Sequence, residues 1–194
     1  RLSPAAFAAE CTLTAVQGNG QVANPVPMKA EKASWSGPCV DGYAQGTGIL
    51  EWHVAGKLQS RYEGEMLRGE RHGQGYVKLA DNTEYEGGFS ANKFHGSGIR
   101  VTTEGRYEGG WKNGKRDGVG KMKFALGGGY EGTWSNDQFH GIGEAVYAGG
   151  SKHVGEFIDG QRVGQANEPL VKNTYSLKSK EHRVGSWVPN DLAR

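Results

Sequence analysis

Residues 107–120 read Tyr-Glu-Gly-Gly-Trp-Lys-Asn-Gly-Lys-Arg-Asp-Gly-Val-Gly, and this stretch decides the fold. Its aromatic and glycine residues recur at every second place in both halves, which is the spacing of a β-strand. The residues between the halves, around Gly114, are of the types that form turns. The stretch therefore predicts a β-hairpin.

Copies of this hairpin recur along the chain at a nearly fixed period. Six copies start at Trp35, Tyr62, Tyr85, Tyr107, Tyr130 and His153. The four that begin with Tyr are spaced by 23, 22 and 23 residues, and a fixed period of this length is typical of repeat proteins. Positions are counted below from the first residue of each copy, so that Tyr107 is at position 1 and Trp111 at position 5.

Glycine and large apolar residues occupy fixed positions in these copies. Glycine fills positions 3 and 12 in all six copies and position 14 in five, and position 5 is large and apolar in the last five. We expect each ring at position 5 to lie opposite the position-12 glycine of its own hairpin, where it finds room to lie flat. In the copy from Tyr85, Ile99 and Val101 fall at positions 15 and 17, whereas other copies have their apolar residues at positions 16 and 18. We therefore expect its second strand to be shifted by one residue or bulged.

The sequence predicts an all-β fold, an elongated and twisted antiparallel meander of stacked β-hairpins in a single-layer sheet. Six repeats span residues 35–166, and residues 1–34 and 167–194 do not repeat and are expected to cap the ends. Hairpin turns are expected near Gly69, Asn92, Gly114, Asp137 and Gly160.

Composition excludes several classes of protein. The 23 Lys and Arg and 21 Asp and Glu leave a net charge of +2, without the dense basic face of a nucleic-acid binder. No apolar run approaches the ~20 residues that span a bilayer, so no transmembrane segment is expected. Glycine supplies 33 of 194 residues, and glycine with aromatic residues has to replace aliphatic residues in the fold.

The repeated positions resemble the MORN repeat (membrane occupation and recognition nexus), whose pattern begins Tyr-Glu-Gly-x-Trp-x-x-Gly and ends Gly-x-Gly. Residues 107–120 match it nearly residue for residue, and the resemblance covers about residues 35–166. It implies a twisted sheet of stacked hairpins and a binding or assembly module that is not an enzyme. Protein attachment, dimerisation and lipid binding are the functions that the resemblance implies.

Columns of histidine and glutamate do not predict an active site. His72, His95 and His140 share position 11, and Glu63, Glu86, Glu108 and Glu131 share position 2. Equivalent positions in successive hairpins lie about 10 Å apart. That distance is too long for ligands ~2 Å from one zinc ion or for the carboxylate pair of a glycosidase. We expect solvated histidines, a solvated acidic row, and no catalytic residue, metal or cofactor.

Partner binding is expected on the aromatic and glycine face, because a single-layer sheet leaves one face open unless it curls or is covered. The candidate contact residues are Tyr62, Tyr85, Tyr107, Trp111, Tyr130 and Trp134. We expect the tyrosines to be only partly covered and to contact a partner protein or a second copy of the chain, and a core role for them is the alternative reading.

Two more specific roles are compatible with a binding scaffold. One is an immunity-type protein of a bacterium that neutralises a secreted toxin or a lipase effector. The other is attachment to a phospholipid surface, for which the basic residues of one repeat are the candidates: Lys112, Lys115, Arg116, Lys121 and Lys123. Asp117 and Glu108 dilute this basic cluster, which favours the protein partner.

The two cysteines, Cys11 and Cys39, allow one intramolecular disulfide. It would tie the N-terminal segment to the first repeat, and closing such a loop is worth ~3–4 kcal/mol in the chain-entropy model. A disulfide favours a periplasmic or secreted protein. Two buried thiols in a cytosolic protein are the alternative.

Overall fold

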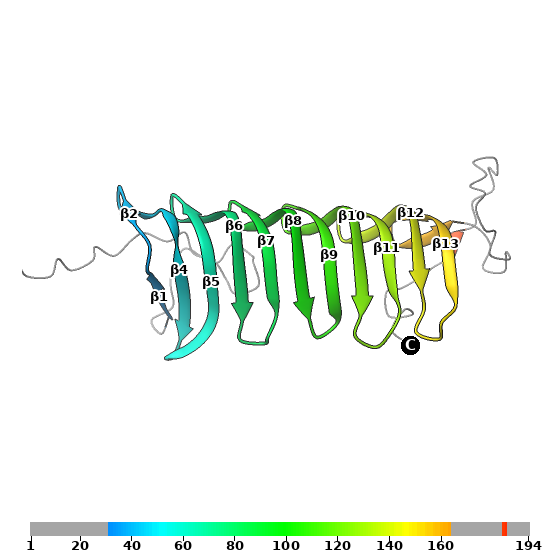
Figure 1. Ribbon diagram of the computed structural model, residues 1–194, viewed down its shortest axis with the longest axis horizontal. Coiled ribbons are helices and arrows are strands. Elements are labelled where there is room, and N and C mark those ends of the chain that lie inside the picture. The colour runs from blue at the N-terminus through cyan, green and yellow to red at the C-terminus, as the bar shows by residue number, and fades with distance from the viewer. Residues whose placement is uncertain (1–30, 164–183, 186–194) are drawn as a thin grey trace, which may run out of the picture.

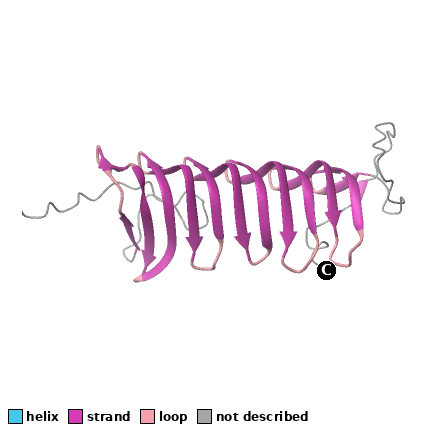
Figure 2. Ribbon diagram, viewed as in Figure 1, coloured by secondary structure: helices cyan, strands magenta, loops and turns pink. Residues whose placement is uncertain are grey.

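The computed structural model describes residues 31–163 and 184–185, which form an all-β structure. One open antiparallel sheet of 13 strands has the order β1-β4-β5-β6-β7-β8-β9-β10-β11-β12-β13-β14-β15, and β2 and β3 form a separate two-stranded ribbon. The strands stand side by side along the long axis (Figure 1), and the described part contains no helix (Figure 2). The predicted elongated meander of hairpins is confirmed.

The strand bounds follow the repeats. They are β1 Glu31–Trp35, β2 Cys39–Val40, β3 Tyr43–Ala44, β4 Gly46–Val54, β5 Lys57–Leu67, β6 Glu70–Leu79, β7 Glu84–Ser90, β8 Lys93–Thr102, β9 Gly105–Lys112, β10 Lys115–Phe124, β11 Gly129–Ser135, β12 Gln138–Val146, β13 Lys152–Ile158, β14 Gln161–Val163 and β15 Val184–Gly185. The other residues expected to cap the array, and Cys11 of the predicted disulfide, lie outside the described residues.

Tight two-residue turns join the strands of each repeat, and all five predicted turn positions are confirmed. The turns are Arg68-Gly69, Ala91-Asn92, Asn113-Gly114, Asn136-Asp137 and Asp159-Gly160. Both residues of each turn have a positive φ, for example 52° at Asn113 and 84° at Gly114. This is the type I′ geometry, whose twist matches that of the flanking strands.

A bulge bends the second strand of the hairpins. Near the turn, position 5 pairs with position 10, as in Trp134↔Phe139, but beyond the bulge position 3 pairs with position 14, as in Gly132↔Gly143. The position-12 glycine lies in the bulge with a positive φ, 62° at Gly141, which side chains other than glycine rarely adopt. The hairpin tips curl back behind the strands along the upper edge of Figure 1.

This bulge corrects two expectations about register. The position-5 ring faces the position-12 glycine of the preceding hairpin, as in Gly118↔Trp134, and not that of its own hairpin. The copy from Tyr85 keeps the common register, because Gly87 pairs with Gly98 as in the other copies. Of the two alternatives expected for this copy, the one-residue shift is therefore wrong, and the bulge is present as in the other hairpins.

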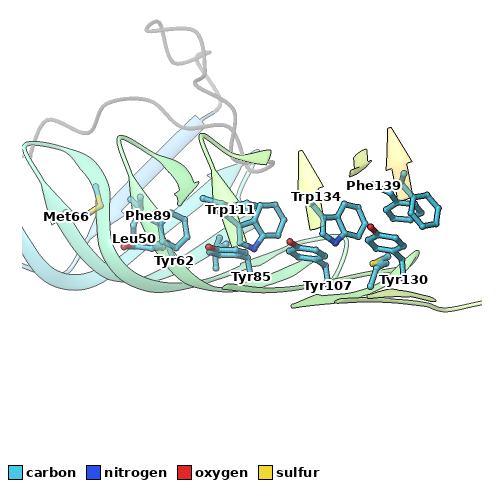
Figure 3. Packing of buried hydrophobic residues seen from close by; sticks show 14 of the residues in the cluster. Leu50, Tyr62, Met66, Tyr85, Phe89, Tyr107, Trp111, Tyr130, Trp134 and Phe139 are labelled. Atoms are coloured by element: carbon cyan, nitrogen blue, oxygen red, sulfur yellow. The ribbon is translucent and has the colours of Figure 1, made fainter. Parts of the chain in front are cut away.

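The core is a row of rings between the strands and the curled hairpin tips (Figure 3). Each position-1 tyrosine lies against the glycines at positions 3 and 14, so that a Cβ atom built on Gly120 would collide with the Tyr107 ring. The Tyr107 hydroxyl donates a hydrogen bond of 3.0 Å to the carbonyl of Gly110, at position 4. Tyr62, Tyr85 and Tyr130 donate in the same way to the position-4 carbonyls of their copies.

Rings of neighbouring hairpins interlock along this row. Tyr107 contacts Trp111 of its own hairpin and Trp134 of the next edge to face, with centroid distances of 5.1 and 5.2 Å. The indole Nε1 of Trp134 donates to the carbonyl of Gly120 in the preceding hairpin at 3.2 Å. Each ring therefore stabilises two hairpins at once, and edge-to-face pairs add to the free energy gained by burial.

The irregular first copy uses the same packing with a different ring. Trp35 lies against Gly37 and Gly48, and its Nε1 donates to the carbonyl of Pro38, at position 4, at 2.9 Å. Proline has no backbone N–H to donate to a ladder, and here β1 ends before it and β2 begins after it.

The contact between tyrosine and glycine predicts a specific cost for one methyl group. Gly120→Ala should lower the free energy of unfolding by about 1–3 kcal/mol, because its Cβ atom would displace the Tyr107 ring. Gly149→Ala is the matched control: a Cβ atom there meets nothing within 4 Å, and its effect should stay within about 0.5 kcal/mol. Urea unfolding of both variants measures the difference, and equal midpoints would contradict the packing described.

Candidate functional site

The six predicted contact residues all lie in the core. Tyr62, Tyr85, Tyr107, Trp111, Tyr130 and Trp134 have exposed fractions between 0% and 4%. The expectation that the tyrosines are only partly covered is wrong, because the curled hairpin tips place rings at positions 5 and 10 against them. Tyr130, for example, stacks on Phe139 with a centroid distance of 3.8 Å.

Burial also keeps these tyrosines neutral. Desolvation raises the pKa of Tyr130 to about 12 and raises the pKa of Tyr62, Tyr85 and Tyr107 well above the ordinary value. Their hydroxyl groups act as hydrogen-bond donors to the backbone, which is a structural role.

The histidine and glutamate columns do not converge. Within residues 31–163 and 184–185, no group of three or more His, Cys, Asp or Glu side chains could hold a metal ion. Three members of the glutamate column, Glu63, Glu108 and Glu131, form ion pairs with Arg61, Arg106 and Lys121. His72 and His95 are exposed, and His140 lies 3.7 Å from Asp159.

Position 10 holds a set of residues that the sequence reasoning missed. It alternates between arginine and phenylalanine in the last five copies: Arg71, Phe94, Arg116, Phe139 and Arg162. Position 8 alternates in step, with glycine in the arginine copies and Asn92 or Asp137 in the phenylalanine copies. The signal was present in the sequence as a period of 45 or 46 residues, twice that of the hairpin.

Each of the first two arginines is held by the turn of the next hairpin. The backbone amide of Arg71 donates to Oδ1 of Asn92 and its Nη2 donates to the backbone carbonyl of Asn92, both at 2.8 Å. Arg116 repeats this with Asp137, at 2.9 Å from its amide and 3.0 Å from its Nη2, and adds an Nε contact of 3.1 Å to Oδ1. We call this arrangement the arginine clasp.

The arginine clasp also includes a ring of the next hairpin. The guanidinium carbon of Arg71 lies 5.1 Å from the Phe89 ring centre, and that of Arg116 lies 4.3 Å from the Trp134 ring centre. Burial lowers the pKa of Arg71 to about 10, so this residue stays charged at neutral pH. Two successive hairpins thus form one structural unit, with the arginine from the first and the ring and turn from the second.

In β8 the polarity of the two faces is inverted. Because the register is unchanged, Arg100 lies on the face of the rings, paired with Tyr85 and Tyr107 in the neighbouring strands. Val101 lies on the opposite, outer face and is 38% exposed. The one-residue offset of the apolar residues in this copy is therefore not a shift of the strand. In this repeat, a polar residue lies on the ring face and apolar residues lie on the outer face.

The outer face carries exposed apolar side chains over β10–β13. We define the outer-face patch by its four members, Val119, Ile142, Val154 and Ile158, which are 75%, 44%, 43% and 40% exposed. Ile142 pairs with Glu156 and Val154 with Glu144, so the two apolar residues are diagonal neighbours on adjacent strands. Val119 lies two strands from Ile142, with β11 between them. Exposed apolar residues on one face are typical of an interaction surface.

The basic cluster proposed for lipid head groups is partly engaged within the protein. Arg116 is held by Asp137, and Lys121 forms an ion pair of 2.7 Å with Glu131. The outer face also holds the ion pairs Lys78–Glu84 and Lys152–Glu144. Cations that are already paired attract an anionic surface less strongly.

The arginine clasp predicts that lysine cannot replace arginine. Arg116→Lys keeps the charge but loses the forked contacts to Asp137 and the stacking on Trp134, and it should lower the free energy of unfolding by about 1–2 kcal/mol. Lys115→Arg is the control at the exposed neighbouring position and should change it by less than about 0.5 kcal/mol. Thermal unfolding of both variants checks this, and equal stability would contradict a role for the forked geometry.

Comparison with known proteins agrees with the repeat structure. A family model of the MORN repeat matches residues 62–84, 85–105, 107–128, 130–152 and 153–166, which together make up more than half of the chain. Four of these stretches begin at the residues whose rings or hydroxyl groups contact the glycines, and the fifth begins at His153. No curated protein matches the chain. In the described part of the chain, no helix is long and apolar enough to cross a membrane.

Proposed function

This chain belongs to the MORN-repeat family, and from that starting point we propose that it is a non-catalytic scaffold that binds a partner protein through the outer face of its sheet. The observation that carries the proposal is that the two faces of the sheet differ in the burial of their apolar side chains. The aromatic side chains of the ring face are buried in the protein's own core, whereas the apolar side chains of the outer-face patch are exposed.

The charges around the outer-face patch suggest the chemistry of the partner. Glu144 and Glu156 lie on β12 and β13 beside members of the patch, and Glu131 lies on β11, between Val119 of β10 and Ile142 of β12. Glu131 and Glu144 are paired with lysines, and Glu156 has no ion pair within the described residues. A protein surface with apolar residues bordered by lysine or arginine would complement this arrangement.

The patch can be tested with variants placed at equivalent positions of different repeats. Val119 and Ile142 both occupy position 13, and the same position holds the exposed Gln74 and Ser97 in earlier repeats. Val119→Asp with Ile142→Asp should abolish capture of the partner, while Gln74→Asp with Ser97→Asp should leave it unchanged. Both pairs should keep the fold, because all four side chains lie on the outer face.

The wild-type chain and the two double variants are immobilised and used for affinity capture from the native source. The captured protein is then titrated against each of them. Loss of a central contact should weaken binding by tenfold or more. Equal capture by the two variant pairs would refute the outer-face patch. Salt-sensitive sedimentation of the wild-type chain with phosphatidylglycerol vesicles, with no protein captured, would favour the phospholipid attachment module instead.

Export to an oxidising compartment is a second element of the proposal. It rests on the cysteine pair, of which Cys39 begins β2 and Cys11 lies outside the described residues. In such a compartment a secreted toxin or lipase effector is a partner class that this scaffold would neutralise, in the manner of an immunity protein.

The Cys11–Cys39 disulfide is expected in protein purified from its native source. Thiol labelling of the denatured, unreduced chain should then find no reactive thiol, and labelling after reduction should find two. Cys39→Ser should also lower the melting temperature of the oxidised chain but not of the reduced chain. Two thiols labelled without reduction would remove the argument for export.

A further inference from the structure

Three lysines gather around the tip of the β9–β10 hairpin. Lys112 ends β9 and Lys115 begins β10, and the two pair with each other directly across the turn. Lys93, at the start of β8 in the preceding hairpin, lies with its Cβ atom 4.0 Å from the place that a Cβ atom on Gly114 would take. All three lysines are exposed. We call these three residues the lysine tip.

The charges of the lysine tip are not compensated within the described part of the chain. Like charges directly opposite each other on neighbouring strands destabilise a sheet. Among Lys, Arg, Asp and Glu, the described strands contain four such pairs: Arg61↔Lys78, Arg106↔Lys123, Lys112↔Lys115 and Glu131↔Glu144. In the other three pairs at least one member forms an ion pair with a third residue, whereas neither Lys112 nor Lys115 does so.

The surroundings of the lysine tip leave its positive charge open to solvent. Positions 6 and 9, which flank each turn, hold only neutral residues besides these lysines in the same three hairpins: Ser90, Ser135 and Gln138. Asp137 of the next turn is held by Arg116 in the arginine clasp. Asp117 lies two residues beyond Lys115 and forms no ion pair with any described residue. The fold therefore maintains a repulsion at this tip that its own carboxylates do not relieve.

We propose that the lysine tip binds an acidic, extended segment of a partner protein. Carboxylates of the segment pair with the lysine ammonium groups and so relieve the repulsion between Lys112 and Lys115. Equivalent positions of successive hairpins lie about 10 Å apart, which is about three residues of extended chain. Asp or Glu at every third residue of the segment would therefore meet Lys93 and then the Lys112–Lys115 pair. This inference goes beyond the outer-face patch and stands without it.

An acidic protein segment suits the lysine tip better than a membrane does. Clusters that bind anionic lipids usually contain about four to eight Lys or Arg side chains, and this one contains three. The hairpin tips lie along one edge of the sheet (Figure 1), and a flat membrane on that edge would also meet the exposed carboxylate of Asp159 at the last described tip. A segment of limited length meets the lysines alone.

Binding at the lysine tip would act mainly on recognition and on the rate of association. Exposed charges that have no partner in the protein attract a partner of opposite charge from solution, and this attraction weakens as salt is added. The outer-face patch is bordered by glutamates, so the two surfaces select partner regions of opposite charge. A scaffold with both contacts fixes the orientation of its partner.

Titration of the full-length chain with a fluorescent peptide of repeated Glu-Ser-Ser tests the proposal at low ionic strength. The peptide should bind, and a matched peptide with Gln in place of Glu should not. Combined Lys93→Gln, Lys112→Gln and Lys115→Gln should weaken binding about tenfold, because three exposed ion pairs are lost. The control combines Lys32→Gln, Lys57→Gln and Lys123→Gln, which removes the same charge from exposed lysines without ion pairs to described residues, and should change binding less than about twofold.

Three results of this titration would overturn the proposal. They are equal weakening by the two triple variants, binding of the Gln peptide as tight as that of the Glu peptide, and no binding of the Glu peptide to the wild-type chain. Phosphatidylserine vesicles provide the remaining comparison. Vesicles that bind the wild-type chain but not the tip variant, while the Glu peptide binds neither, would assign the lysine tip to a membrane instead.

Lys112→Glu separates the stability of the hairpin from binding at its tip. The substitution replaces a like-charge pair with an opposite-charge pair across from Lys115, so it should raise the melting temperature by about 1–4 °C at low salt. The same variant should bind the Glu peptide at least about tenfold more weakly. A melting temperature no higher than that of the wild-type chain would contradict the repulsion, and unchanged peptide binding would refute the site.

Discussion

A tyrosine ring laid against two glycines is the contact on which the rest of this structure depends. The ring fills the space that two missing side chains leave, and its hydroxyl donates to a carbonyl at position 4, where the strand bends. The bend brings the hairpin tip back over the ring, so that a sheet of one layer obtains an interior. Aliphatic residues are scarce in this chain because rings and bare backbone form most of that interior.

The same contact explains which parts of the fold the sequence could predict. Period-two spacing and the residues around Gly69, Asn92 and Gly114 predicted the hairpins and their turns, because strand and turn preferences are local. Local preferences did not reveal the bulge, because the position-12 glycine was interpreted as leaving room for the position-5 ring of the same hairpin. That glycine is needed for its positive φ, and this misreading placed the rings of position 5 in the wrong hairpin.

The burial of the candidate contact residues could not be predicted for a related reason. Tyr107 and its equivalents were selected because an aromatic face on a single-layer sheet has to be open or covered, and the curl that closes it is a property of the backbone at the bulge. The arginine clasp was missed because its period is twice that of the hairpin. When single copies are aligned, Arg71 and Phe94 fall at the same position, and the alternation between them looks like random variation. Arg100 was hidden by the assumption that apolar residues mark the inner face in every repeat. The ion pairs and the outer-face patch depend on cross-strand neighbours, which follow only from the register.

The arginine clasp has a consequence for how an array of this kind can change in length. Removal of one hairpin, such as residues 85–106, would set Arg71 against Gly114, which has no side chain to hold it. Removal of two successive hairpins would set it against Asp137, and every remaining clasp would keep its partner. Growth and loss by recombination should therefore be tolerated in double steps of about 45 residues, twice the 22–23-residue period seen in the sequence. Hairpins can therefore be added or removed only in pairs if every arginine is to keep an Asn or Asp partner.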